Sequence, residues 1–392
     1  MSLTGRLIYV QNNLHVTLTP FRGESRVLKE TASLVQQGLV QRVFIVALFE
    51  NGLREREDID AVRTVWRVKL RSRNWPKNFI SQLFKYVEFC WRVSSYANRN
   101  QVKMVNIHWL GLLPLGVWLK LRFGAKLIYD THELETETMG LNGFRKAVSK
   151  VVERALIRFA DLTIVVGKEI EKWYRKEYQI NSIATVLNCP PYRQTQKTRL
   201  LRDEFNIPDS QKVVLYQGAL STGRGVELLL DAFENASDNR YVVIFMGYGE
   251  LEKRIKDAVA RCPRIRYKPG VPPSEVLAYT ASADVGISAI EDSCLSYHYC
   301  LPNKMFEYVM AHVPVVVSNL PEMRNVVNTY GVGAVMQNWD DGSIFQALRR
   351  LEELNKDVLD RNLNVAAKEF SWQGQEEVMA QAYKTHILAK GD

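Results

Sequence analysis

The chain alternates short, almost wholly apolar runs with amphipathic segments such as 145–160 and 226–236, and it does so through both halves of its length. In the first half, the runs are "RLIYV" (6–10), "RVFIVA" (42–47), "KMVNIH" (103–108), "KLIYD" (126–130), "LTIVV" (162–166) and "IATVL" (183–187). In the second half, they are 212–218, 241–247, 265–270, 284–288, 313–318 and 333–336. Continuous apolar strands are typical of parallel sheets that helices cover on both faces. The pattern predicts an α/β protein with two doubly wound, Rossmann-like domains.

A proline pair and a polar stretch mark the boundary between the two halves. Pro190 and Pro191 are followed by "YRQTQKTR" (192–199), the composition of a linker. A chain of 392 residues is long enough for two domains with a core each. We therefore expect an N-terminal domain over residues 1–190 and a C-terminal domain over 195–371.

The net charge of +9 fits several classes of anionic partner and does not choose among nucleic acid, anionic lipid and phosphorylated substrates. The five cysteines are scattered, without C-x-x-C spacing, so we expect neither a disulfide framework nor a zinc site. A reducing, cytoplasmic location fits this cysteine usage. We expect no membrane span and no signal peptide.

Glycine-rich or polar segments follow three of the expected strands in the second half. They are "YQGALSTGRG" (216–225), "FMGYGE" (245–250) and the long loop "GISAIEDSCLSYHYCLPNK" (286–304). Ligands of such sheets bind beyond the carboxyl ends of the strands, where helix N-termini attract anions. Glycines allow the backbone to approach an anion, and Arg224 adds a permanent positive charge. These segments predict a ligand that carries phosphate.

The segment "CLPNKMFEYVMAHVPVVVS" (300–318) predicts a helix that leads into a buried strand. Pro302 suits the first helical turn, because its missing N–H costs nothing there. At about 100° per residue, one side of the helix carries Asn303, Lys304, Glu307 and Tyr308, and the other side is apolar. The polar side faces either solvent or a ligand.

In this order, "GALSTGRGVELLLDAF", "FMGYGE", "YTASADVGISAIED" and "LPNKMFEYVMAHVPVVVS" resemble the family 4 retaining glycosyltransferases of the GT-B fold. The resemblance is strongest over residues 212–336 and weaker in the first half. It implies two Rossmann-like domains that face each other across a cleft. The second would bind a nucleotide-diphospho-sugar and the first the acceptor, and a C-terminal helix over 372–392 would cross back onto the first.

The resemblance also assigns donor-side residues. Glu307 matches the second glutamate of the family's E-x7-E motif, which binds the ribose hydroxyls, and Arg224 matches a basic residue that binds the diphosphate. Ala219 stands where the family has a partner arginine, so Lys304 is the candidate for the second charge. Tyr299 replaces the first glutamate, and Glu291 or Asp292 are candidates to take its place. The implied donor-binding set is Gly218, Gly223, Arg224, Gly247, Gly270, Tyr299, Asn303, Lys304 and Glu307.

On the acceptor side, "LIYDTHELE" (127–135) resembles a family strand that ends in a histidine at the active site. This makes His132 a catalytic candidate, together with Arg224 and Lys304. "VNIHWLGLLPLG" (105–116) places His108 near the acceptor. Asn12, Asn13 and Arg22, in what we expect to be the opening loop, are the remaining acceptor-side candidates. Both histidines have an alternative interpretation as residues that only pack the sheet.

The family's reaction implies little protein chemistry beyond charge stabilisation of the leaving diphosphate. In front-face transfer, the departing phosphate oxygen takes the acceptor's proton, so no protein nucleophile is needed. Arginine and lysine replace Mg²⁺, and we expect no metal and no cofactor besides the donor substrate. The "LPNK-x-FEY" variant resembles bacterial enzymes that move a hexose-type sugar onto a saccharide or lipid-linked saccharide in surface polysaccharide or glycolipid synthesis.

Two other functions are compatible with parts of the sequence. A UDP-sugar 2-epimerase-like enzyme has the same architecture, but needs acid–base carboxylates and histidines around the sugar in patterns that are not evident here. A non-catalytic basic binding protein fits the charge. However, no helix-turn-helix, zinc or RNA-reading aromatic motif is evident, so we do not expect nucleic acid as a partner.

The segment "KNFISQLFKYVEFCWR" (77–92) has apolar residues at helical spacing among basic ones. The apolar residues are Phe79, Ile80, Leu83, Phe84, Val87 and Trp91. Such a helix either packs on the sheet of its own domain or lies in the plane of an anionic membrane. The surrounding basic residues, among them Arg67, Lys69, Arg71 and Arg73, favour peripheral contact with the inner face of the plasma membrane.

Overall fold

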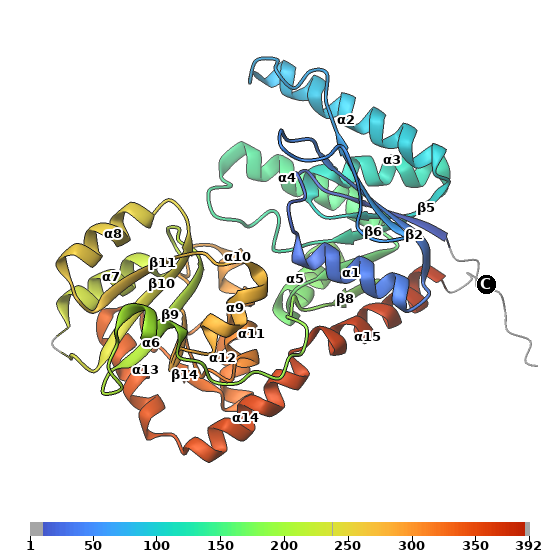
Figure 1. The fold of residues 1–392 in the computed structure, drawn as a ribbon. Helices are drawn as coiled ribbons and strands as arrows, with labels where there is room; N and C mark the ends of the chain where they lie inside the picture. The colour runs from blue at the N-terminus through green and yellow to red at the C-terminus, as the bar shows by residue number, and fades with distance from the viewer. Residues whose placement is uncertain (1–10, 237, 389–392) are drawn as a thin grey trace, which may run out of the picture. The chain divides into compact units, whose positions relative to one another are not determined.

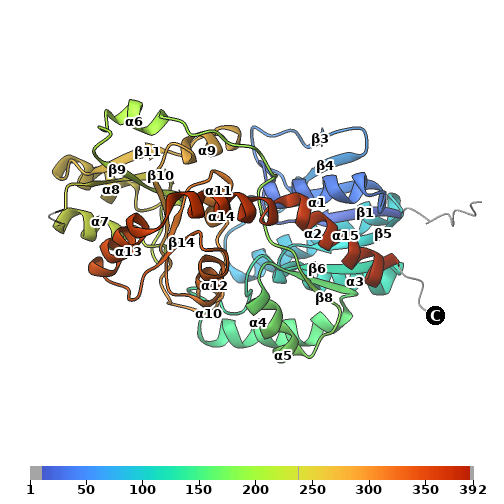
Figure 2. The same ribbon diagram turned by 90° about the horizontal axis from the view of Figure 1, so that it is seen from below.

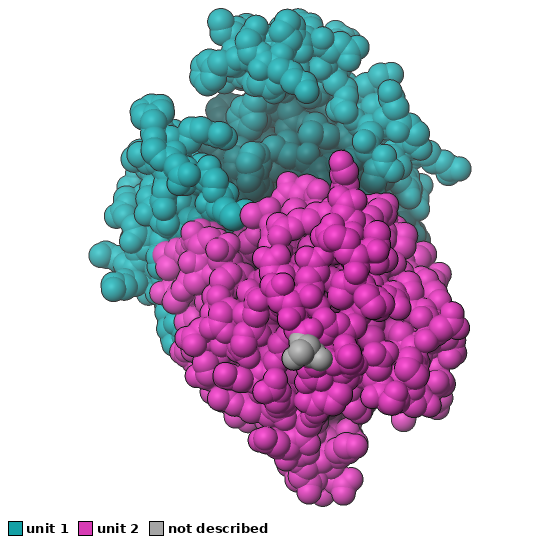
Figure 3. Space-filling view, turned by 90° about the vertical axis from the view of Figure 1, so that its left-hand side faces the viewer, with its two compact units in different colours: residues 1–186, 376–392 teal, residues 187–375 magenta. Residues whose placement is uncertain are grey.

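The computed structural model describes residues 11–236 and 238–388. The chain forms two compact units, which Figure 3 shows in different colours. Unit 1 comprises residues 1–186 and 376–392, and unit 2 comprises residues 187–375. The sequence placed the boundaries at 190 and 372. In the structure, helix α15 (Trp372–Tyr383) begins in unit 2 and continues in unit 1.

Unit 1 contains an eight-stranded sheet in the order β3-β4-β2-β1-β5-β6-β7-β8. All neighbours pair in parallel except β3 and β4. The strands are β1 (Gln11–Val16), β2 (Val40–Leu48), β3 (Arg56–Asp58), β4 (Arg63–Val68), β5 (Val102–Ile107), β6 (Lys126–Asp130), β7 (Leu162–Val165) and β8 (Ile183–Thr185). The carboxyl ends of β1, β5 and β6 are therefore adjacent at one edge of the sheet.

Helices cover both faces of this sheet (Figures 1 and 2). The helices are α1 (Ser25–Gln36), α2 (Phe79–Arg99), α3 (Leu113–Phe123), α4 (Gly143–Leu156) and α5 (Lys168–Tyr178), with short 3₁₀ turns at Leu110–Leu112 and Ile157–Phe159. Successive side chains of a strand point to opposite faces. Accordingly, Tyr129 donates a hydrogen bond to Glu153 of α4, whereas Asp130 pairs with Arg26 of α1. On the α1 side, Tyr383 of α15 accepts a hydrogen bond from Asn106, before a π-helical turn (Lys384–Leu388).

Unit 2 contains an all-parallel, six-stranded sheet in the order β11-β10-β9-β12-β13-β14. The strands are β9 (Lys212–Ala219), β10 (Tyr241–Tyr248), β11 (Ile265–Pro269), β12 (Val285–Ser288), β13 (Val315–Val317) and β14 (Gly333–Val335). The helices are α6 (Leu200–Phe205), α7 (Val226–Asn235), α8 (Glu252–Arg261), α9 (Pro273–Thr280), α10 (Leu295–His298), α11 (Asn303–Met310), α12 (Pro321–Tyr330), α13 (Asp341–Glu353) and α14 (Lys356–Glu369). Strand order reverses between β9 and β12, the position where ligands bind in such sheets.

The predicted strands agree with the structure within a few residues, with differences in the first half. The predicted strand at 6–10 lies outside the described residues, and among those described the first strand is β1, Gln11–Val16. Asn12 and Asn13 are therefore strand residues, and the expectation that they belong to a loop is wrong. The sequence also missed β3 and β4, because "RED" and "RTVWRV" are too polar to read as buried parallel strands.

Helix α2 packs on the sheet only through its C-terminal half, where Phe89, Val93 and Tyr96 are buried. Apolar side chains of its N-terminal half lie in solvent, with Phe79 82% and Phe84 55% exposed, and so does Trp91 of the C-terminal half, at 69%. The helix therefore packs on its own domain, as one of the two interpretations expected, but the apolar side chains of its first part do not take part in this packing. Arg67, expected among the surface charges, is buried and paired with Glu57. Within 11–236 and 238–388, no helix is both long and apolar enough to cross a membrane.

Candidate active site

A hollow of about 300 Å³ lies at the carboxyl ends of β9 and β10 in unit 2. Its walls are Gln217, Gly218, Ala219, Met246, Gly247, Tyr248, Gly270, Val271, Val276 and Glu307. Gly218 has a φ of +115°, which side-chain-bearing residues rarely adopt. At Gly247, a Cβ atom would lie 1.9 Å from the carbonyl oxygen of Gly218. The sequence therefore needs glycine at both positions to bring two strand ends together around the hollow.

Glu307 reaches this hollow from helix α11 through a chain of polar contacts. Gln217 Nε2 donates a hydrogen bond to Glu307 Oε2 at 2.5 Å, and Thr280 Oγ1 donates to Gln217 Oε1 at 2.7 Å. The next residue, Tyr308, is wholly buried and donates to the backbone oxygen of Leu215. These contacts fix the rotation of α11, so that the Glu307 carboxylate faces the ends of the strands.

Lys304, one turn before Glu307, is buried with only 7% of its surface exposed. Its Nζ lies 3.6 Å from the centre of the Tyr216 ring and has no hydrogen-bond partner among the described residues. Its stem passes Gly218, where a Cβ would lie 3.9 Å from Lys304 Cε. Burial, and then the nearby charge of Arg224, lower the pKa of Lys304 to about 7. The ammonium group is poised to accept an anion at the Gly218 turn.

Arg224 lies in the turn between β9 and α7, where two glycines determine the backbone. Gly223 and Gly225 have φ values of +76° and +81°, and a Cβ at Gly225 would lie 2.5 Å from that of Ala289. The Arg224 guanidinium lies 5.5 Å from the centre of the Tyr297 ring. The turn thus places a second cation near Lys304, on the side of the 286–304 loop.

The other predicted donor residues are more peripheral. Tyr299 ends the short helix α10 and is half-buried, and Asn303 is exposed at the first position of α11. Asp292, one of the candidates to replace the missing glutamate, faces His298 at 3.0 Å. The backbone N–H of Glu291, the other candidate, donates to Gly223 at 3.0 Å. This contact ties the 286–304 loop to the Arg224 turn.

In unit 1, ionisable side chains gather where β1, β5 and β6 end. His108 Nδ1 lies 3.0 Å from Asp130 Oδ2, and His132 Nε2 lies 3.4 Å from the same oxygen. Arg26 of α1 binds both oxygens of Asp130, at 2.8 and 3.1 Å. Burial alone would raise the pKa of Asp130, but the Arg26 charge and the histidine hydrogen bonds hold it well below its usual value. Only the His132 side chain, 40% exposed, faces outward.

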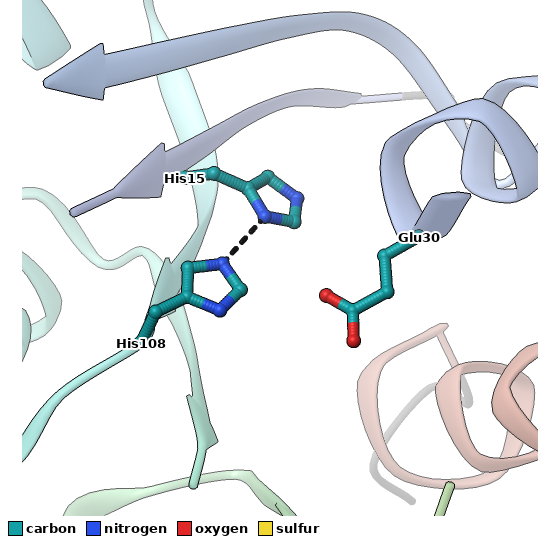
Figure 4. A group of neighbouring side chains, drawn as sticks. All are labelled: His15, Glu30 and His108. Carbon is teal, nitrogen blue, oxygen red and sulfur yellow. Dashed lines mark hydrogen bonds between the residues drawn. The ribbon is translucent and has the colours of Figure 1, made fainter. Parts of the chain in front are cut away.

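Two further buried groups extend this cluster, as Figure 4 shows. His15 Nδ1 lies 2.9 Å from His108 Nε2, and Glu30 of α1 points toward the pair. Burial lowers the pKa of His15, and burial, followed by the Asp130 charge, raises that of Glu30. His15, Glu30 and His108 are close enough to share a metal ion, as are His108, Asp130 and His132. Arg26, 2.9 Å from Glu30 and bound to Asp130, already supplies positive charge to both groups, so they fit an internal network better than a cation site.

Further carboxyl groups of unit 1 have raised pKa values, among them Glu24 and Glu135. Burial raises the pKa of Glu24, and the charge of His132 offsets part of this rise. Burial, followed by the charges of Glu133 and Glu153, raises the pKa of Glu135 to about 8. Neither was predicted from the sequence, nor were His15, Arg26 and Asp130. One signal in the sequence could have identified Asp130, namely a polar residue at the end of an apolar strand, "KLIYD". The same signal applies to Gln217 in "KVVLYQG".

The structure does not bring all acceptor-side candidates to this edge. Asn12 and Asn13 lie at the amino end of β1 and bond to the backbone oxygens of Asn100 and Met104. Their amides hold neighbouring strands together, away from His132. Arg22 lies in the loop after β1, exposed and paired with Glu50 at 2.8 Å. Of the predicted acceptor residues, the cluster contains only His108.

Comparison with known proteins matches each of the two units to a glycosyltransferase family model. Residues 23–189 match the family model described as "Glycosyl transferase 4-like domain", and residues 211–353 match "Glycosyl transferases group 1". The chain belongs to the group 1 glycosyltransferases. It is 25% identical over 288 residues to chitobiosyldiphosphodolichol beta-mannosyltransferase of Candida albicans. The alignment covers 67% of this chain and 61% of that enzyme.

Solved structures with the same architecture confirm the GT-B fold. Sucrose-phosphate synthase of Thermosynechococcus elongatus superposes with a TM-score of 0.80 at 14% identity, over 97% of this glycosyltransferase and 100% of that chain. Anabaena HepE, solved in complex with UDP-glucose, gives a TM-score of 0.72 at 13% identity, over 96% and 100% of the two chains. At these identities the likeness establishes the fold alone.

Proposed function

We propose that this glycosyltransferase moves a hexose-type sugar, with retention of configuration, from a nucleotide-diphospho-sugar to a saccharide or lipid-linked saccharide. The pathway we favour is bacterial surface polysaccharide or glycolipid synthesis in the cytoplasm. The UDP-glucose in the HepE structure and the mannosyl transfer named for the Candida relative support a nucleotide sugar and a hexose. The lipid diphosphate in the relative's name supports a lipid-linked acceptor.

The observation that carries the donor proposal is the unpaired cation of Lys304. A buried ammonium group without an anionic partner is costly, and the protein lowers its pKa instead of neutralising it with a carboxylate. A diphosphate at the Gly218 turn would supply the missing anion. Arg224 would bind the same group from the other side, and the N-terminus of α7 would add its partial positive charge.

Glu307 would bind the ribose of the nucleotide. Its carboxylate lines the hollow, and Gln217 fixes one oxygen of it by a hydrogen bond. A charge-assisted bond to a hydroxyl is stronger than a neutral one. Gly218, Gly247 and Gly270 would let the nucleotide lie against the backbone, while Tyr299 and Asn303 would contact the sugar side.

The transfer itself needs stabilisation of the leaving diphosphate more than it needs a strong base. Lys304 and Arg224 would provide it without a metal or other cofactor. In front-face transfer, the bond from the anomeric carbon to the phosphate oxygen breaks as the acceptor oxygen bonds to that carbon. The acceptor's proton then passes to the departing phosphate oxygen. His132 would orient the reacting hydroxyls from unit 1, held by Asp130.

Peripheral contact with an anionic membrane would bring the enzyme to a lipid-linked acceptor. The N-terminal half of α2 exposes Phe79, Ile80 and Phe84 by 82, 66 and 55%. Arg73 and Lys77 are exposed beside it, and Lys85 is half-buried and donates a hydrogen bond to the backbone oxygen of Trp75. Aromatic and aliphatic side chains would enter the headgroup boundary while the cations meet anionic lipid. Sedimentation with anionic vesicles should capture the protein at low salt and release it as salt rises; absence of capture would favour a soluble acceptor.

A thermal-shift screen against UDP-, GDP-, ADP- and dTDP-sugars tests the donor proposal, because a ligand of the native state raises the melting temperature. The sugar that stabilises the protein should then be released slowly or transferred in the presence of EDTA. The anomeric configuration of the product, measured by NMR, tests retention. If no nucleotide sugar raises the melting temperature, the proposal fails, and epimer formation would favour a 2-epimerase-like enzyme.

A further inference from the structure

A second hollow, of about 500 Å³, lies within unit 1 beside the loop that carries His132. Its walls come from the end of β5 and start of α3, from the loop after β6, and from one side of α4. The lining residues are Trp109, Leu110, Gly111, Pro114, Glu135, Thr138, Met139, Gly140, Leu141, Arg145, Val148, Ser149 and Val152. The loop from Thr131 to Asn142 follows β6 directly. It carries both the outward-facing His132 and part of the lining of the hollow, from Glu135 to Leu141.

Seven of the thirteen lining residues have apolar side chains, and the walls remain open to solvent. Trp109, Met139 and Val148 are 49, 47 and 42% exposed. The Trp109 ring packs on Gly111, where a Cβ would lie 2.3 Å from it, so the wall is held in place without a ligand. A preformed concave site with apolar walls and few polar groups is the usual form of a ligand pocket.

Only two charged side chains line the hollow, and they differ in role. The raised pKa of Glu135, about 8, leaves its carboxyl mostly protonated at neutral pH, so it adds little charge to the floor. Arg145 is exposed and has no ion-pair partner among the described residues. By contrast, Lys146 and Lys150 on the same helix both pair with Glu137. Arg145 is therefore the cation available to a ligand.

The two helices that contribute to the hollow also carry exposed apolar side chains that do not line it. Helix α4 exposes Phe144 and Val151 by 83 and 66%, and α3 exposes Trp118 and Leu121 by 54 and 67%. A hydrocarbon chain leaving the hollow along α4 would remain in contact with apolar side chains. A polar sugar alone would not use this surface, but an amphiphile would.

We propose that this hollow binds the hydrocarbon chain of a prenyl-phosphate-type acceptor lipid and that Arg145 pairs with the lipid's phosphate. The inference rests on the proposed function, because it names the lipid part of the acceptor for the same transfer. The sugar attached to the phosphate would then extend toward His132.

Farnesyl phosphate, used below its micelle concentration, is a soluble probe for this site in the full chain. Calorimetry should detect its binding, weaker binding of farnesol, and none of inorganic phosphate. Val148→Asp should weaken binding by about tenfold or more, because it places a charge against the hydrocarbon chain. Val365→Asp, at a 60% exposed position of α14 in unit 2 that does not line the hollow, is the matched control and should change affinity by less than about twofold. Arg145→Gln should weaken farnesyl phosphate binding and leave farnesol binding unchanged.

No binding of farnesyl phosphate to the wild-type chain would overturn the proposal. So would equal losses for Val148→Asp and Val365→Asp, since these would indicate adsorption to exposed apolar surface. Melting temperatures of the variants guard against loss of fold, which is not expected at half-exposed positions. Nucleotide-sugar binding, measured on the same samples, separates the outcomes: if it persists without prenyl phosphate binding, only the lipid site is wrong.

Discussion

The carboxyl edges of the two sheets both contain buried ionisable groups, but they differ in whether the main buried charge has an opposite charge beside it. In unit 1, Asp130 has Arg26, His108 and His132 around it, so the buried charge of this carboxylate is satisfied internally. In unit 2, the buried Lys304 has an aromatic ring and a second cation beside it, and no anion among the described residues within salt-bridge distance. A satisfied network positions the one group that faces outward, whereas an unsatisfied cation marks where a charged ligand belongs.

Lys304→Met tests the unsatisfied side and should have the largest effect. We expect turnover to fall by about 10²–10³-fold, because a preorganised cation at the leaving diphosphate is lost. The free energy of unfolding should not fall, since methionine fills the space without a buried charge. Steady-state kinetics and denaturant unfolding measure the two quantities, with Lys253→Met on the exposed surface of α8 as control. Near-normal turnover would remove Lys304 from the diphosphate site.

His132→Ala and Asp130→Asn test the satisfied side. His132 is 40% exposed at the edge, so its loss should reduce turnover by about 100-fold and barely change the melting temperature. Asp130→Asn should instead destabilise the fold by about 3–5 kcal/mol, because the buried Arg26 would lose the carboxylate that binds it through both oxygens and would keep only Glu30 as an ion-pair partner. If His132→Ala melted earlier but turned over normally, His132 would be a packing residue.

Glu307→Gln tests whether the carboxylate in the hollow of unit 2 binds the ribose of the donor. The variant keeps the shape of the side chain but loses the charge that would accept a ribose hydroxyl. Donor affinity should fall by about tenfold, at an unchanged melting temperature. Calorimetry with the stabilising nucleotide measures it, and Glu353→Gln on α13 is the control. Equal affinities for wild type and variant would argue against ribose binding by Glu307.

Much of the donor side could be predicted from the sequence because its signals are local. Glycines after strands, Arg224 between two of them and the polar side of the 300–318 helix are all readable in short segments. The helical pattern placed Lys304 and Glu307 on one side, but it could not show that Tyr216 covers the ammonium group. That contact joins residues far apart in the chain, as does the bond from Gln217 to Glu307.

The acceptor side was harder to predict because its cluster is assembled from several segments. His15, Arg26, His108 and Asp130 come from β1, α1, the end of β5 and the end of β6, and no spacing links them. Strand register mattered as well: Asn12 and Asn13 were expected in a loop at the site, but β1 places them at its amino end. A strand's position in the sheet, which local sequence does not fix, decides which end of it a residue occupies.

A further prediction is a dependence of stability on pH that comes from Lys304 alone. Its pKa is lowered from 10.5 to about 7 in the folded chain, so between these values the unfolded chain binds more protons. The free energy of unfolding therefore gains a contribution from Lys304 that rises by about 1.4 kcal/mol per pH unit above pH 7 and is flat below it. Lys304→Met lacks this contribution, so its stability advantage over the wild type should shrink steadily from pH 7 to pH 9. Guanidinium unfolding at pH 6, 7, 8 and 9 measures the difference, with Lys253→Met as the control that should parallel the wild type. A constant difference across this range would mean that Lys304 stays charged in the folded chain, and that another group satisfies it before any nucleotide binds.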